Sequence, residues 1–170
     1  NPLCSSLNLP LTVTRQPLFW FIPQNPNLFQ FNQFPIFVLE IKNDCWLYGF
    51  PDIGQGFKVA LHHQGELTDP YQVNREVTHE EVELIRSLLQ KYVPEGNGVL
   101  HSTAVCLYTN TPDHHFILDY HPLDPQVIVA SPCSGHGFKF SSVIGEVIRE
   151  MIEHGKMSFN LAPFALNRWP

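Results

Sequence analysis

The residue types best suited to chemistry fall in three short stretches of the chain. The first, Ser134-Gly135-His136-Gly137-Phe138-Lys139, joins an expected strand to an expected helix. Glycines let a backbone approach a ligand closely, and a helix N-terminus presents unpaired N–H groups that attract negative charge. Lys139 adds a full positive charge at a place where a cation opposes the helix dipole. The pattern suits a site for an anion or an electron-rich ring edge, but by itself it slightly favours an ordinary tight turn with a surface lysine.

The second stretch is the apolar strand expected over residues 57–62. Strand alternation puts Lys58, Ala60 and His62 on one face and three apolar side chains on the other. A lysine in so apolar a strand either lies at a sheet edge, where it blocks aggregation, or points into a pocket.

The third stretch is the strand expected over residues 103–109. Alternation puts Ala104, Cys106 and Tyr108 on one face. A lone cysteine in a strand is usually a small buried hydrophobic residue. The residues by themselves therefore favour a structural role for Cys106.

Metal-binding and nucleotide-binding motifs are absent from the sequence. The four cysteines are Cys4, Cys45, Cys106 and Cys133. They form no C-x-x-C pair, which favours a reduced, cytoplasmic protein over a zinc site or a disulfide scaffold. The nine histidines show no H-E-x-x-H pattern, and the neighbours His62 and His63 are expected to point to opposite faces of a strand. We expect no metal. The sequence also lacks G-x-S-x-G, the P-loop and G-x-G-x-x-G.

The elements that must position these residues are strands in runs and two amphipathic helices. The expected strands cover residues 11–21, 36–41, 45–50, 57–62, 103–109, 116–120 and 127–130, and the expected helices cover 78–93 and a segment that ends near 153. Strands that do not alternate with helices predict an α+β fold with a largely antiparallel sheet. Thr78 and Glu81 form a capping-box pattern at the first helix, and Gly155 suits the C′ position of the second. Pro17 indicates an edge or a break in its strand, and residues 36–41 read as a buried strand.

Composition excludes two classes of partner. Ten basic residues against sixteen acidic ones give a net charge of −6, and no Lys/Arg cluster is present, so no nucleic acid is expected. The longest apolar stretch, residues 18–22, is far shorter than the roughly 20 residues that cross a bilayer, so no membrane partner is expected.

Several strings occur in an order and spacing that resemble a known family. They are Tyr48-Gly49-Phe50-Pro51, Gly56-Phe57-Lys58 with His62, Asp69-Pro70 followed by Val73-Asn74-Arg75-Glu76, Cys106-Leu107-Tyr108-Thr109, and Ser134-Gly135-His136-Gly137-Phe138-Lys139-Phe140-Ser141-Ser142. Together they resemble the C-terminal part of the monomeric sarcosine oxidase and N-methyltryptophan oxidase family. These are FAD-dependent amine oxidases of the D-amino-acid-oxidase-like superfamily. The likeness runs over residues 9–168.

The resemblance implies an oxidase of sarcosine or a related N-methyl amino acid, with FAD as cofactor and O₂ as oxidant, giving an imine and H₂O₂. It implies that Cys106 carries FAD through a thioether, because a thiolate is a strong nucleophile. It implies that Lys58 promotes the reaction with O₂, because a fixed cation stabilises developing negative charge. Lys139 would bind the substrate carboxylate.

Further site residues follow from the same resemblance. Tyr48 and His62 match catalytic residues of the substrate pocket, and Tyr108 matches a substrate contact. The remaining cofactor-binding residues would be Gly135, His136, Gly137 and Phe138.

The resemblance also implies a domain organisation. Residues 1–109 would form a substrate-binding domain with the flavin-attachment strand, and residues 110–170 would return to the FAD-binding domain. The half with G-x-G-x-x-G is missing from the sequence, so we interpret the chain as a C-terminal fragment that is inactive alone and whose partner is that half. Two other hypotheses stay open: a cofactor-less remnant that self-associates, and a metal-binding module built on the nine histidines.

Overall fold

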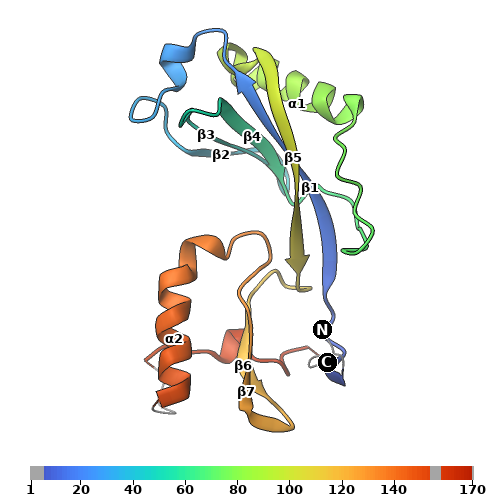
Figure 1. Cartoon of the computed structure of the whole chain (residues 1–170), viewed down its shortest axis with the longest axis vertical. Helices are drawn as coiled ribbons and strands as arrows, with labels where there is room; N and C mark the ends of the chain where they lie inside the picture. Colours follow the sequence, from blue (N-terminus) through green and yellow to red (C-terminus); the bar gives the residue numbers. More distant parts are fainter. Residues whose placement is uncertain (1–5, 154–157, 170) are drawn as a thin grey trace. The chain divides into compact units, whose positions relative to one another are not determined.

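The computed structural model describes residues 6–153 and 158–169. The chain divides into two compact units, one of Thr14–Leu107 and one of Asn1–Val13 with Tyr108–Pro170 (Figure 1). Over the described residues the chain forms seven strands and two α-helices, and the fold is α+β as the sequence predicts.

A five-stranded sheet forms the first unit. Its order is β2 (Phe37–Lys42), β3 (Cys45–Phe50), β4 (Phe57–His62), β1 (Thr12–Ile22) and β5 (Val99–Asn110). The pairs β2–β3, β3–β4 and β4–β1 are antiparallel. Strand β4, which carries Lys58, is therefore an interior strand, and β2 and β5 are the edges.

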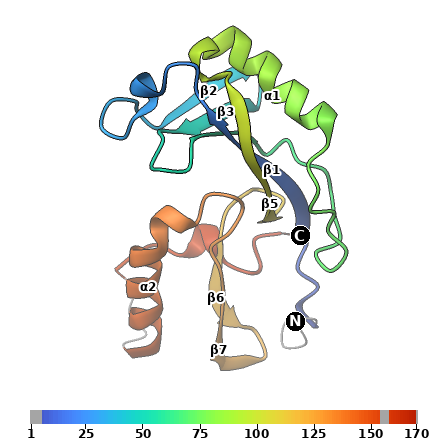
Figure 2. The same ribbon diagram turned by 45° about the horizontal axis from the view of Figure 1, so that its top comes forward.

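The core of this unit lies between the sheet and helix α1 (His79–Tyr92), as Figures 1 and 2 show from two sides. Phe57 and Val59 of β4 pack with Ile85 and Leu89 of α1, and all four side chains are almost fully buried. Alternation along β4 then places Lys58, Ala60 and His62 on the face of the sheet that α1 does not cover.

Helix α1 begins where the sequence predicts. The Thr78 side chain accepts a hydrogen bond from the Glu81 amide, and the Glu81 carboxylate accepts one from the Thr78 amide. This reciprocal pair satisfies two of the amide groups that a helix start leaves unpaired. The helix ends at Tyr92, just before Pro94.

The prediction of a buried strand at residues 36–41 is wrong. Strand β2 is a sheet edge, and Ile36 and Val38 are 63% and 69% exposed. An edge strand has a neighbour on one side only, so an apolar run does not by itself ensure burial. For Pro17, neither the edge nor the break is found: it lies within β1, a continuous strand from Thr12 to Ile22 in the interior of the sheet. The register with β4 covers Phe19–Phe21, and Thr14 forms a separate bridge with Leu67.

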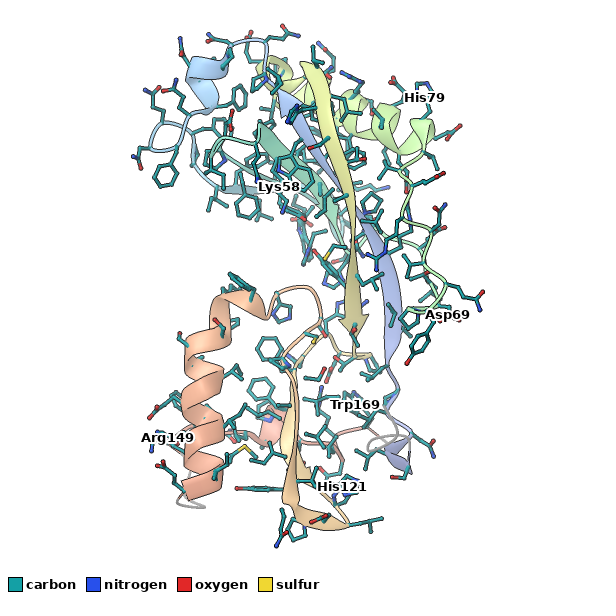
Figure 3. All side chains as sticks on the ribbon, viewed as in Figure 1. Lys58, Asp69, His79, His121, Arg149 and Trp169 are labelled. Carbon is teal, nitrogen blue, oxygen red and sulfur yellow. The ribbon has the colours of Figure 1, made fainter. Side chains whose placement is uncertain are left out.

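The second unit holds the hairpin of β6 (Ile117–His121) and β7 (Asp124–Ser131) and helix α2 (Ser141–Glu153). Leu118 of β6 packs with Val147 and Met151 of α2. Figure 3 shows Arg149 on the side of α2 that points away from this hairpin. The expected capping residue Gly155 lies outside the described residues. Within those residues, neither helix has the length and apolar character needed to cross a membrane.

Candidate functional site

Lys58 lies at the centre of the sheet and lines a cavity. Its cross-strand partners are Trp20 on β1 and Phe50 on β3. The Lys58 Nζ lies 5.3 Å from the centre of the Trp20 ring and 5.2 Å from that of Phe50, within the range of cation–π attraction. The edge-lysine interpretation is therefore wrong, and the pocket interpretation is confirmed.

The cavity has a volume of about 580 Å³ and is lined mostly by apolar and amide side chains. Trp20, Phe50 and Lys58 line it together with residues 31–36 and with Pro51, Ile53, Gln55 and Gly56. Burial lowers the pKa of Lys58 below its ordinary value of 10.5, and an electrostatic interaction with Cys106 acts in the opposite direction. The amine is thus a partly desolvated cation in an aromatic surrounding, and Figure 3 marks it on β4.

Tyr48 and His62 lie on the same face of the sheet as Lys58. Tyr48 pairs with Ala60, and Trp46 pairs with His62. The His62 ring centre lies 6.0 Å from that of Trp46 and 6.2 Å from that of Tyr48. The three predicted catalytic side chains therefore share one surface, although Tyr48 and His62 do not line the cavity beside Lys58.

The two neighbours His62 and His63 do not point to opposite faces as predicted. Strand β4 ends at His62, and His63 takes a left-handed conformation with φ +56°. The strand rule stops at that residue, and the two ring centres lie 4.1 Å apart. Across the described part of the chain, no three His, Cys, Asp or Glu side chains gather into a group that could hold a metal.

Cys106 is a free, exposed thiol on the edge strand β5. Its Sγ lies 3.7 Å from the carbonyl oxygen of Leu107. The prediction from residues alone, a small buried hydrophobic residue, is wrong because β5 has a strand neighbour on one side only. An exposed thiol is accessible to an electrophile, which a buried structural cysteine is not.

The glycine-containing loop packs tightly in its own unit. Gly135 has φ +75°, and a Cβ at this position would lie 2.4 Å from Cε2 of Tyr108. A Cβ on Gly137 would lie 1.5 Å from the carbonyl oxygen of Pro132. Both positions therefore require glycine for steric reasons within the chain itself, whether or not a ligand is bound.

The loop is also fixed by hydrogen bonds. The Ser134 amide donates to the Thr109 carbonyl at 2.8 Å. The His136 Nε2 lies 2.8 Å from the carbonyl oxygen of His114, and its ring centre lies 4.9 Å from that of Phe116. The imidazole of His136 is thereby held in one orientation.

Phe138 and Lys139 are the exposed part of this loop. They lie in a 3-10 turn, Phe138–Phe140, that precedes the start of α2 at Ser141. Phe138 is 94% exposed, and the Lys139 Nζ lies 5.4 Å from the Phe140 ring centre. Lys139 is thus an exposed cation just ahead of a helix start.

The structure distributes the predicted site residues over its two units. Those of the sheet unit are Tyr48, Lys58, His62 and Cys106. Those of the other unit are Tyr108, Gly135, His136, Gly137, Phe138 and Lys139. Within each unit they form connected groups, one around Lys58 and one around the Tyr108–Gly135 contact.

Sequence reasoning missed one central residue, Arg15 of β1. Its side chain is only 3% exposed, and its guanidinium forms an ion pair with Glu81 at the start of α1. Its Nε and Nη2 donate to the carbonyl oxygens of Asn74 and Glu76. A charged residue inside the apolar strand at residues 12–22 is the signal that could have indicated it.

Comparison with known proteins assigns a family to this chain. A family model described as FAD dependent oxidoreductase matches residues 5–151. The chain belongs to the FAD dependent oxidoreductase family. The resemblance found in the sequence is thereby confirmed.

Two curated members of the family are similar over nearly the whole chain. Monomeric sarcosine oxidase from Bacillus sp. (strain B-0618) is 41% identical over 99% of this chain and 44% of its own length. N-methyl-L-tryptophan oxidase from Citrobacter koseri is 31% identical over 95% of this chain and 43% of its own length. The chain therefore spans less than half the length of these relatives.

A solved structure supports the same fold. Fructosamine oxidase from Aspergillus fumigatus (Amadoriase II) superposes with a TM-score of 0.73, at 20% identity, over 95% of this chain and 41% of its own. At this identity the likeness concerns the fold alone.

The residues of this chain fit the ring end of FAD, the cofactor of the family. Cys106 presents an accessible thiol, and Lys58 presents an amine against two aromatic rings at a cavity of the same sheet. The chain lacks the G-x-G-x-x-G string that holds the ADP end. The fit therefore concerns the flavin ring and not the whole dinucleotide.

Proposed function

We propose that this chain is the substrate-binding and flavin-attaching part of an FAD-dependent amine oxidase that acts on sarcosine or a related N-methyl amino acid. The observation that carries the proposal is geometric: the Lys58 amine lies against the Trp20 and Phe50 rings at a cavity, and the exposed thiol of Cys106 lies on an edge strand of the same sheet. The Cys106 thiol could attach the flavin ring covalently, and the Lys58 ammonium on the same sheet could assist its reoxidation. The likeness to sarcosine oxidase, 41% identical over 99% of the chain, supports the substrate class.

The bound FAD would accept two electrons from the amine and pass them to O₂, giving H₂O₂ and an imine that water hydrolyses to an aldehyde and an amine. Lys58 would hold a positive charge where O₂ becomes negative. Its aromatic neighbours Trp20 and Phe50 keep water from part of the ammonium group, which strengthens its field.

Each unit offers its own groups for a substrate. Tyr48 and His62 offer hydroxyl and imidazole groups on the Lys58 face of the sheet. Lys139 offers an exposed cation for the substrate carboxylate, and Tyr108 a further contact. Gly135, His136, Gly137 and Phe138 would border the flavin.

The proposal also includes a partner for this chain and its place in the cell. The partner would be an FAD-binding half that supplies the dinucleotide-binding residues. Exposed apolar side chains around the Lys58 cavity, such as Phe31 at 64% and Ile53 at 72%, suit such a covering partner or self-association. The free thiols of Cys45, Cys106 and Cys133 suit the reducing cytoplasm.

Acid precipitation tests the proposal. The protein encoded by the complete open reading frame is precipitated with acid, and flavin absorbance is read in the pellet and in the supernatant. A yellow pellet is expected, and Cys106→Ser should move the colour to the supernatant. Cys133→Ser, which removes another exposed thiol, should leave the pellet yellow. Yellow in the wild-type supernatant alone would reject covalent attachment, and a colourless protein would reject the oxidase and favour a remnant that self-associates.

A further inference from the structure

An arginine outside the proposed catalytic groups contacts the strand that carries Cys106. The Nη1 of Arg75 donates a 2.8 Å hydrogen bond to the carbonyl oxygen of Val105. Val105 and Cys106 share one peptide unit, so this bond acts on the backbone that directly bears the thiol. Arg75 comes from the loop before α1, 30 residues earlier in the chain.

Hydrogen bonds from Arg15 fix the backbone on both sides of Arg75 in the loop. The carbonyl of Asn74 accepts a 2.8 Å hydrogen bond from Nε of the buried Arg15, and the carbonyl of Glu76 accepts another from Nη2. The Asn74 side chain also accepts from the Glu76 amide at 3.0 Å. The backbone around Arg75 is thus anchored to β1, and its exposed side chain reaches from a fixed base.

The contact falls where β5 needs support. Strand β5 ends the sheet order, so within the described residues its outer side has no neighbouring strand. Edge strands have unpaired carbonyl groups and open more readily than interior strands. The Arg75 bond gives the Val105 carbonyl, beside Cys106, a side-chain donor from outside the strand, and a charged donor makes it stronger than a neutral one.

We propose that Arg75 is a positioning residue for the attachment of flavin to Cys106. The inference rests on the proposed function. In that attachment the S–H bond of Cys106 and one C–H bond of the 8α-methyl group of the ring break, and an S–C bond forms. The two hydrogens, with two electrons, pass to O₂ and give H₂O₂. Arg75 takes no part in this bond exchange; it fixes the peptide from which the sulfur reacts.

The first readout is the covalent share of bound flavin. The protein from the complete open reading frame is loaded with FAD, and the covalent fraction is followed over time. Arg75→Gln should slow attachment roughly three- to tenfold, the loss that one ordinary solvent-exposed hydrogen bond corresponds to, while total FAD stays unchanged. Arg75→Lys keeps a charged donor and should fall between the wild type and Arg75→Gln.

The matched control is Arg86→Gln. Arg86 also donates from Nη1 to a backbone carbonyl, that of Gly98, at 3.0 Å, just before β5 begins at Val99. The Arg86→Gln substitution therefore removes the same kind of arginine-to-carbonyl hydrogen bond, next to the first residue of β5. Arg86→Gln should leave the attachment rate at the wild-type value.

The second readout is amide hydrogen exchange of the 170-residue chain without FAD. Arg75→Gln should speed exchange in the peptide that contains Cys106 by roughly three- to tenfold, and Arg86→Gln should not. Faster exchange with a normal attachment rate would overturn the proposal, because the role would then be structural only. Equal slowing in both arginine variants would overturn it too. A wild-type protein with no covalent flavin would overturn the proposed function itself, and with it this inference.

Discussion

The ring of Tyr108 fills the space that a side chain on residue 135 would need. A Cβ at Gly135 would lie 2.4 Å from Tyr108 Cε2, and the backbone there has φ +75°. Space and conformation thus both require glycine, and the Tyr108 ring contributes to the position of the loop that borders the proposed flavin site. A substitution at residue 135 therefore tests how much this contact stabilises the chain.

Gly135→Ala should destabilise the chain by about 2 kcal/mol, because alanine at positive φ is strained and the Tyr108 ring must move. Urea denaturation measures this loss. Gly145→Ala is the matched control: it lies inside α2 with nothing within 4 Å of an added Cβ. It should stabilise the chain by about 0.5–1 kcal/mol. An equal effect of both substitutions would contradict the account of Gly135.

Lys58→Met should slow reoxidation of the flavin by O₂ roughly 100-fold, because a single preorganised charge contributes about this much. Stopped-flow absorbance of the reduced enzyme mixed with O₂ measures the rate. Lys91→Met removes a lysine that also lies near an aromatic ring, 4.9 Å from the centre of Tyr92, but on the exposed side of α1. It should leave the rate unchanged. Normal reoxidation in Lys58→Met would contradict the role of the ammonium.

The same substitution changes the pH dependence of stability. Burial lowers the pKa of Lys58 in the folded chain, so between that pKa and the ordinary value of 10.5 the unfolded chain binds more protons. The Lys58 contribution to stability therefore rises with pH across this window. Lys58→Met should remove that rise and should raise the Tm at neutral pH. A parallel pH profile of the two proteins in thermal unfolding would contradict this.

Arg15→Met should destabilise the chain by about 3–5 kcal/mol, the range found when one partner of a buried ion pair is removed. It leaves Glu81 without its cation and the Asn74 and Glu76 carbonyls without a donor. Urea denaturation of Arg15→Met, Glu81→Gln and the double variant gives the coupling energy. Additive losses would show that the two side chains do not act together.

Asp113 and Arg168 give the second unit a sensitivity to acid. Arg168 donates to both carboxylate oxygens of Asp113, at 2.7 and 3.1 Å, and holds the pKa of that carboxyl well below its usual range. A carboxyl with a lowered folded pKa contributes stability that is present above about pH 4 and lost as the pH falls below it. Arg168→Gln should flatten this acid loss and cost about 1 kcal/mol at neutral pH. Thermal unfolding over a pH series measures both, and an unchanged acid limb would contradict the pairing.

Local signals in the sequence predict most of the elements. The capping box of Thr78 and Glu81 marks the start of α1. This signal depends on residues close together in the chain. For the same reason the apolar alternation around Lys58 gives the correct face of β4 without knowledge of its neighbours.

Burial, in contrast, depends on strand order, which comes from pairings distant in the sequence. The exposure of Val38 and Cys106 follows from the edge positions of β2 and β5. The contact of His62 with His63 follows from one left-handed residue. The roles of Arg15 and Arg75 require the loop before α1 to fold back on the sheet. No local pattern contains that information.

The contacts of Arg15 with Glu81 and with the loop before α1 have a consequence for folding during synthesis. Arg15 and Glu81 are 66 residues apart, so the ion pair cannot form until the ribosome has released the start of α1. Strand β4 has been made by then, but β5 follows α1 in the chain, so β1, with its apolar residues 18–22, still lacks one of its two strand neighbours and is open to aggregation. Arg15 places a charge in this strand while the strand is incompletely paired, and a charge beside an apolar segment opposes aggregation. The residue that stabilises the folded sheet therefore also protects β1 from aggregation during synthesis.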